Sequence, residues 1–272
     1  MFKVIHKEVL AQGIQRIEIQ AELIARKACA GQFVVVIVDE KGERIPLTLA
    51  DWNKEKGTIG LIFQEVGYST RRLGKLKVGD SIFTLLGPLG NATDVKEFGT
   101  VVCVGGGVGI AEVYPISRAF KSANNEVIGI IGSRDKNLII LEQEMKDVCD
   151  QLYVTTDDGS YGRKGFVTEV LKELLQANKH IDLVYAIGPV VMMKAISELT
   201  RPQNIKTIVN LNPIMVDATG MCGACRCKVG EKTVFGCVDG PEFNGHLVDF
   251  AELQSRLNAF KKQEGQINET FD

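Results

Sequence analysis

The hydrophobic and polar positions of the chain follow one rhythm up to about residue 98 and another from Thr100 onward. In the first part, Ile14–Ile19 and Thr58–Gln64 alternate or carry β-branched residues, and Phe33–Val38 is a continuous β-branched run. The first pattern is typical of half-buried strands and the second of a buried strand. Turn residues separate these segments at short spacing. Residues 1–98 therefore predict an all-β barrel domain of antiparallel strands, with one short helix at Ser69–Leu76.

From Thr100 onward, strand-like and helix-like segments alternate. A strand runs from Thr100 into a glycine loop, and further strands are expected at 126–131, 151–156, 181–188 and 206–211. Helices are expected between them at 110–122, 138–148, 165–177 and 190–199. This alternation indicates βαβ units around a parallel sheet, so we expect an α/β nucleotide-binding domain over residues 99–211. A cysteine loop over 212–250 follows, and 251–272 should form a C-terminal helix and a polar tail that ends in disorder.

Charge and composition narrow the function classes. The 272 residues carry 32 Lys+Arg and 34 Asp+Glu, a formal net charge of -2, which gives no electrostatic case for nucleic acid or a membrane surface. The N-terminus lacks the apolar core of a signal peptide, and no apolar stretch is long enough to span a bilayer. We therefore expect a soluble, cytoplasmic protein. In such a chain, the cysteines crowded between residues 222 and 237 argue for metal rather than for disulfides.

The glycine loop after the Thr100 strand is the first candidate binding site. A turn without β-carbons lets backbone N–H groups approach a pyrophosphate at the positive end of a helix. The loop departs from G-x-G-x-x-G because Ile110 stands at the third glycine, so a tight βα turn without a ligand is the alternative. The candidate residues are Gly105, Gly106, Gly107, Val108 and Gly109.

A second loop strengthens the nucleotide interpretation. Gly188, Pro189 and Met192 follow another strand of the same domain and precede a helix. In an open parallel sheet, ligands bind outside the carboxyl ends of the strands. Arg134, after the second strand, could meet a 2′-phosphate, so the motifs leave NADP open beside NAD.

The cysteine loop carries the most specific motif of the chain. Plant-type [2Fe–2S] loops use C-x4-C-x2-C followed by a distant cysteine. Asp217, Cys222, Cys225 and Cys237 fill that frame, with Asp217 in place of the first thiolate. The glycines between them let the backbone wrap around sulfide and offer N–H donors, which help to set the reduction potential.

The residues alone leave two alternatives open for this loop. Zinc would accept the same ligands, although zinc sites usually pair two C-x2-C knuckles and only one is present. Cys227 could replace Asp217 as the fourth ligand. Because it lies only two residues after Cys225, we expect it to point away and to pack as a small hydrophobe.

The order of these segments along the chain is a barrel, a glycine-loop domain and a cysteine loop. This order resembles that of the ferredoxin-reductase-like electron-transfer subunits, over residues 1 to about 255. Two branches of the family come into question. One is the electron-transfer subunit of class B dihydroorotate dehydrogenase, which usually shows four cysteines. The other is the small subunit of NADH-dependent ferredoxin:NADP oxidoreductase, also described as sulfide dehydrogenase. The segments Asn212–Asp217 and Cys237–Phe243 resemble this second branch, which shows Asp at the first position.

The resemblance also implies a flavin site in the barrel. Arg44–Thr48 is similar to the flavin strand of the family, with one residue more between Arg and Thr, and Val66–Thr70 is similar to the loop that holds the FAD pyrophosphate. An ordinary helix N-cap is the alternative for the second segment. The implied FAD residues are Pro46, Leu47, Thr48, Gln64, Gly67, Ser69 and Thr70.

The resemblance implies a heteromeric oxidoreductase that moves electrons between NAD(H), FAD and one [2Fe–2S] cluster, with no catalytic acid or base. The cluster would exchange electrons with a larger, glutamate-synthase-like iron–sulfur flavoprotein subunit in a bifurcating complex, and indirectly with ferredoxin. Electron transfer to dihydroorotate dehydrogenase B is the second candidate. A zinc-bearing interaction module is the candidate from another class.

Overall fold

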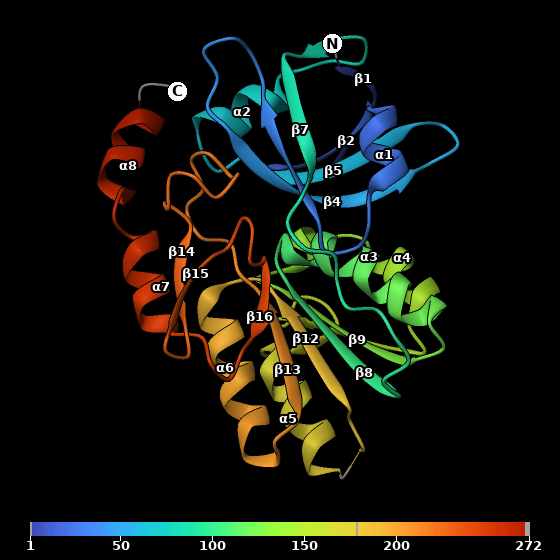
Figure 1. The fold of residues 1–272 in the computed structure, drawn as a ribbon. Helices are drawn as coiled ribbons and strands as arrows, with labels where there is room; N and C mark the ends of the chain where they lie inside the picture. Colours follow the sequence, from blue (N-terminus) through green and yellow to red (C-terminus); the bar gives the residue numbers. More distant parts are fainter. Residues whose placement is uncertain (1, 178, 270–272) are drawn as a thin grey trace. The chain divides into compact units, whose positions relative to one another are not determined.

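The computed structural model describes residues 2–177 and 179–269, which group into two compact units (Figure 1). The first unit holds the chain up to Ala92, Asn212–Pro241 and the chain from Ala251 onward. The second holds Thr93–Leu211 and Glu242–Phe250. The cysteine loop therefore belongs to the same unit as the N-terminal strands.

The first unit is built on a nearly closed antiparallel barrel, in the strand order β6-β1-β2-β5-β4-β3-β7. Its strands are β1 (Phe2–Ala11), β2 (Ile14–Gln20), β3 (Phe33–Ile37), β4 (Ile45–Asn53), β5 (Thr58–Gln64), β6 (Ser81–Ile82) and β7 (Thr84–Leu89). Two helices accompany them, α1 (Glu22–Lys27) and α2 (Tyr68–Gly74). The predicted barrel and its short helix are confirmed, whereas α1 was not expected from the sequence.

Strand β3 explains why its sequence shows no alternation. Val34 and Val36 belong to the barrel core together with Leu49 and Leu61. Val35, from the other face of the same strand, packs in a second apolar cluster under the cysteine loop. Each fully buried valine contributes about 1.5–3 kcal/mol, so both faces of β3 stabilise the unit.

The second unit is an α/β domain around a sheet in the order β11-β10-β9-β8-β12-β13-β16. Its strands are β8 (Thr100–Gly106), β9 (Glu126–Ser133), β10 (Gln151–Thr156), β11 (Arg163–Lys164), β12 (Leu183–Ile187), β13 (Lys206–Asn210) and β16 (Glu242–Asn244). Its helices are α3 (Gly109–Ser122), α4 (Glu142–Val148), α5 (Val167–Gln176) and α6 (Val190–Thr200), with 3-10 turns η1 (Lys136–Leu138) and η2 (Arg201–Gln203). In Figure 1, α3 and α4 cover one face of the sheet, and α5 and α6 cover the other.

Most strand pairs of this sheet are parallel, as the alternating pattern predicts. The exception is β16, which adds to β13 in the antiparallel sense. The sequence did not indicate this strand, because three residues after a cysteine loop carry too little pattern.

The rest of the first unit holds the hairpin β14 (Arg226–Val229) and β15 (Lys232–Phe235), then α7 (Phe250–Leu257) from its second residue onward, and α8 (Lys261–Glu269). The expected disordered end of the tail is wrong as far as Glu269, because Lys, Gln and Glu are good helix formers. Residues 270–272 of that prediction lie outside the described residues. No helix in the described part of the chain is both long and apolar enough to cross a membrane.

Candidate functional site

The order of strands creates a switch point in the nucleotide domain. The chain moves from β8 to β9 on one side, and it later returns to place β12 on the other side of β8. The carboxyl ends of β8 and β12 lie side by side, with Gly105 paired to Ile187. Ligands of open α/β sheets bind at this position.

The two loops predicted from the sequence meet there. A β-carbon on Gly106 would lie 2.5 Å from Met192 Sδ and 3.1 Å from Pro189 Cδ. A β-carbon on Gly188, which has φ +150°, would lie 2.8 Å from Met192 Cε. A β-carbon on Gly188 would also lie 3.0 Å from the Gly106 carbonyl oxygen and 3.1 Å from its Cα, so the glycine loop and the Gly188 loop lie against each other.

The opposite side of the glycine loop is open. Gly107 has φ +58°, and a β-carbon there would meet nothing within 4 Å. Its N–H donates to the carbonyl of Gly132 at 2.8 Å, and this bond ties the loop to the end of β9. Helix α3 begins at Gly109, and the Ile110 and Ala111 N–H groups donate to the carbonyls of Gly107 and Val108 at 3.2 and 2.9 Å. The positive end of the helix thereby faces the loop, where it favours an anion. This geometry fits a dinucleotide pyrophosphate.

The flavin candidates of the barrel lie where β4 changes partners. Strand β4 pairs with β3 through Ile45–Thr48 and with β5 through Leu49–Asn53, with a register shift after Leu49. Pro46, Leu47 and Thr48 are half-buried. They pair with β3 and lie in the part of β4 that does not pair with β5. Gln64 is the last residue of β5, close in sequence to α2. An edge of β4 is thereby left for a flat ligand.

The candidates around α2 have different roles. The Thr70 hydroxyl accepts from the Gly67 N–H at 3.1 Å and donates to the Gly67 carbonyl at 3.0 Å, so Thr70 caps the helix. Ser69 donates to Glu43 Oε2 at 2.6 Å. A β-carbon on Gly67 would meet nothing within 4 Å, so there is space over this turn. A diphosphate at Ser69 would have to displace the Glu43 carboxylate.

Two of the predicted metal ligands are in contact under the cysteine loop. The Cys225 and Cys237 sulfurs lie 3.2 Å apart, and both side chains are buried. Burial, followed by the neighbouring Cys225, raises the pKa of the Cys237 thiol to about 12. The pair packs against Phe33 and Val35 of β3. The Cys237 thiol therefore becomes a thiolate only where a cation offsets the charge.

The other two predicted ligands, Asp217 and Cys222, form a second pair at the surface of the loop. The N–H groups of Ala224 and Asp217 donate to the exposed Cys222 sulfur and lower its pKa. The negative charge of the Asp217 carboxylate acts in the opposite sense and raises that pKa. Thr219, the Met221 N–H and Arg44 lower the pKa of Asp217, so the carboxylate is an anion.

The arrangement is one of pairs rather than of a single centre. Within residues 2–177 and 179–269, no three His, Cys, Asp or Glu side chains converge as a single metal ion would require. A two-iron group needs two protein ligands for each iron, and the pairs Asp217/Cys222 and Cys225/Cys237 supply them. The residues present therefore fit an iron–sulfur cluster.

Cys227 is not part of either pair, and its sulfur contacts the main-chain carbonyl of Cys225 at 3.6 Å. Its thiol is buried, and the charged residues nearest to it are Glu252 and Arg256 of α7. Burial raises its pKa to about 12. Arg256 also donates to the Ala224 carbonyl at 2.9 Å, so this face of the loop is fastened to α7.

Sequence reasoning left one functional residue without a role. Arg44 belongs to the motif that resembles a flavin strand, but its guanidinium contacts Asp217 at 2.7 Å. The extra residue between Arg44 and Thr48 was the only signal in the sequence that Arg44 has another partner.

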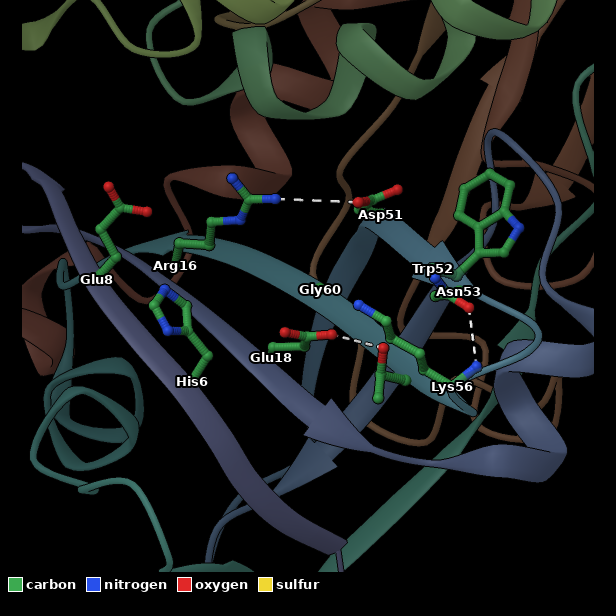
Figure 2. Close-up of a pocket in the computed structure, with 10 residues that line it drawn as sticks. His6, Glu8, Arg16, Glu18, Asp51, Trp52, Asn53, Lys56 and Gly60 are labelled. Atoms are coloured by element: carbon green, nitrogen blue, oxygen red, sulfur yellow. Dashed lines mark hydrogen bonds and ion pairs between the residues drawn. The ribbon is translucent and has the colours of Figure 1, made fainter.

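The barrel also has an open pocket of about 330 Å³ on β1, β2, β4 and β5 (Figure 2). Basic and acidic side chains alternate along it, and Arg16 Nη2 lies 3.9 Å from Asp51 Oδ2. Its lining includes none of the predicted site residues. The chemistry described above is therefore elsewhere in the chain.

Two family models match the chain. Residues 103–198 match the oxidoreductase NAD-binding domain, and residues 212–249 match the iron–sulfur cluster binding domain of dihydroorotate dehydrogenase B. The second match decides for iron–sulfur over the zinc alternative that the spacing left open.

Relatives and a solved structure match over nearly the whole chain. A Thermotoga maritima homolog of the electron transfer subunit of dihydroorotate dehydrogenase B (NAD(+)) is 44% identical, over 99% of this chain and 95% of its own length. The Clostridium perfringens electron transfer subunit of that enzyme is 30% identical, over 89% of this chain and 94% of its own length. A chain from the structure of the NADH-dependent reduced ferredoxin-NADP oxidoreductase, solved for insight into flavin-based electron bifurcation, is 42% identical. Its TM-score is 0.94, with coverage of 100% of this chain and 98% of that one.

Fold and site together define a ferredoxin-reductase-like oxidoreductase, with a fold that binds FAD, an NAD-binding domain and an iron–sulfur binding domain. Within that class, the chain belongs to the family of the dihydroorotate dehydrogenase B electron-transfer subunits.

Proposed function

We propose that this chain is the electron-transfer subunit of an NADH-dependent ferredoxin:NADP oxidoreductase, which connects NAD(H), FAD and one [2Fe–2S] cluster with a larger flavoprotein subunit. The main support is the likeness to the solved oxidoreductase chain at 42% identity and full coverage. An aspartate at the first position of the cysteine frame supports the same branch.

The observation that carries the electron-transfer function is the position of β3. On one side its backbone pairs with the flavin candidates, Phe33 with Thr48 and Val35 with Pro46. The side chains of these same β3 residues pack against Cys225 and Cys237. One strand thus separates the candidate flavin edge from the buried thiol pair, so a path for electrons would run through packed apolar side chains.

When bound, FAD exchanges an electron pair with a nicotinamide and single electrons with an iron–sulfur cluster. The chain's own residues bind and orient the groups. Gly105 to Gly109 and the Gly188 loop would hold the dinucleotide, and the open edge of β4 would hold the flavin ring. Asp217 and Cys222 would bind one iron, and Cys225 and Cys237 the other.

A larger subunit would dock over the exposed pair of the cluster loop. Met221 is 88% exposed, Val216 is 59% exposed and Val238 is 43% exposed, and all three lie within the cluster loop. Exposed apolar side chains around a site are typical of contacts with a partner. This surface would bring the partner to the exposed Cys222 and the half-buried Asp217.

The test is to purify the chain with each candidate partner from its own genome. A complex with a glutamate-synthase-like flavoprotein should reduce ferredoxin and NAD⁺ together at the expense of NADPH, or run that reaction in reverse. The second candidate is favoured by the names of the dihydroorotate dehydrogenase relatives. A stable complex that instead reduces NAD⁺ with dihydroorotate would establish that candidate and reject ours.

A further inference from the structure

The loop between β3 and β4 is fastened to α2 and ends at Arg44. The Arg72 guanidinium lies 2.6 Å from the Asp39 carboxylate, and Ser69 donates to Glu43 at 2.6 Å. A bound diphosphate would displace Glu43 from Ser69 but would leave the Arg72–Asp39 ion pair in place, so the loop that carries Arg44 stays anchored to the barrel.

Arg44 makes two bonds to one residue of the cysteine loop. Its Nη1 donates to Asp217 Oδ1 at 2.7 Å and to the Asp217 main-chain carbonyl at 2.9 Å. These contacts fix the carboxylate relative to its own backbone. An ion pair of two freely moving surface side chains would lack the second bond.

The other carboxylate oxygen is held from within the loop. Asp217 Oδ2 accepts from the Thr219 N–H at 3.0 Å and from the Thr219 hydroxyl. A carboxylate has about four acceptor positions, and Arg44 and Thr219 occupy three of them, so a metal bond would take the fourth in place of the Met221 N–H. With both oxygens engaged, the carboxylate is oriented for a single bond to iron.

We propose that Arg44 is a positioning residue that holds the Asp217 carboxylate in a one-oxygen orientation toward the cluster and offsets its negative charge. The inference rests on the proposed function, because it requires Asp217 as an iron ligand. Arg44 would thus link the segment that precedes the flavin strand to the ligand that distinguishes this cluster.

The physical consequence is a higher reduction potential. Reduction adds an electron to the cluster, and a nearby positive charge favours that added negative charge. Arg44 is 39% exposed at its side chain, so water and salt screen part of the effect. Loss of the charge should therefore lower the ratio of reduced to oxidised cluster roughly tenfold at a fixed potential, which corresponds to ~59 mV for one electron.

The experiment is a redox titration of the full chain, loaded with FAD and cluster and followed by electron paramagnetic resonance. Arg44→Met should lower the cluster potential by that amount and change the cluster spectrum, with FAD still bound. Arg44→Lys keeps the charge and should restore most of the potential. Arg26→Met is the matched control, because it removes an exposed arginine that pairs only with Glu22 on α1 among the interactions described here. It should leave the potential unchanged.

A loaded Arg44→Met variant with the wild-type potential and spectrum would overturn this inference and leave the proposed function intact. If Arg44→Met does not hold the cluster, the potential of Arg44→Lys becomes the test. A Lys variant whose cluster potential lies ~59 mV or more below that of the wild type would overturn the charge argument. A wild-type chain without a cluster would overturn the proposed function and this inference together.

Discussion

At the scale of single residues, Asp217 is the position that separates this chain from a loop with four thiolates. The Thr219 hydroxyl and N–H, the Met221 N–H and Arg44 lower its pKa, so it offers a charged oxygen at neutral pH. As a ligand, an oxygen is harder than sulfur, and Asp217 would give one iron a ligand set unlike that of the other. The loop is therefore built to keep an anion where a cysteine stands in related sites.

Asp217→Ala should lose this ligand and the bonds that orient it. We expect iron to be retained at least about tenfold less well, a loss that even outer-shell changes can cause, while FAD stays bound. The measurement is iron and sulfide per flavin after gel filtration. Cys227→Ala is the control, because its thiol is buried toward α7, and it should keep the cluster. Full iron in Asp217→Ala with loss in Cys227→Ala would make Cys227 the fourth ligand.

The cysteine spacing was sufficient to predict an iron–sulfur loop, because ligand spacing is a local property of the sequence. Arg44 could not be assigned in the same way. Its contact with Asp217 joins residues 173 positions apart, and only the fold brings them together. Local motifs thus suggest candidate ligands, whereas contacts between distant segments become visible only in the folded chain.

At the scale of elements, the glycine loop and the Gly188 loop depend on each other. A β-carbon on Gly109 would lie 2.6 Å from the Ile187 carbonyl oxygen and 2.9 Å from its carbon. These are backbone atoms of a buried strand, so they cannot move aside as a flexible side chain could.

Gly109→Ala should therefore distort the nucleotide site. Overpacking of this kind costs about 1–3 kcal/mol, which predicts roughly tenfold weaker NADH binding. Titration with NADH under anaerobic conditions measures it, and the flavin and cluster spectra should remain those of the wild type. Gly265→Ala on α8, where a β-carbon meets nothing within 4 Å, is the matched control. Equal NADH affinity in the two variants would remove this loop from the nucleotide site.

Strand β16 begins with a carboxylate inside the nucleotide domain. Glu242 Oε1 accepts from the Tyr185 hydroxyl at 2.6 Å and from the Thr93 hydroxyl at 2.5 Å. Burial is the largest influence on this group, and it raises the pKa of Glu242 above the ordinary value of 4.5. In the folded protein this carboxyl keeps its proton to higher pH than in the unfolded chain.

The sign of the pH dependence follows from that difference. Between pH 4.5 and the raised pKa, the folded state binds more protons than the unfolded state, so stability contributed by Glu242 is lost as the pH rises. Glu242→Gln removes this titration and should gain stability relative to the wild type across the same interval. Thermal unfolding at a series of pH values measures it, with the exposed Glu198→Gln as control. A difference between Glu242→Gln and wild type that is independent of pH would contradict the assignment.

The elements were predictable in proportion to their length and periodicity. Strand β10 (Gln151–Thr156) and helix α6 (Val190–Thr200) were expected within one residue, because each carries a clear period. Short elements such as α1 and β16 were missed, since their formation depends on pairing and packing with distant residues.

At the scale of the whole molecule, the chain assigns its functions to two compact units in an order that the sequence does not follow. The barrel with its flavin candidates and the loop with its cluster candidates form one unit, although more than a hundred residues separate them in the sequence. The nucleotide loops lie in the other unit. The three expected segments were visible in the sequence, but the grouping of the first with the third was not. It arises from the apolar cluster between β3 and the cysteine loop, which only the folded chain reveals.

The central claim is that one chain passes electrons between NADH, flavin and cluster. The most direct measurement is an anaerobic visible and electron paramagnetic resonance spectrum of the purified full chain, before and after addition of NADH. We predict flavin and iron–sulfur bands, bleaching of the flavin by NADH and a signal from the reduced cluster. A featureless spectrum with stoichiometric zinc, or bound flavin and cluster that do not respond to NADH, would contradict the account.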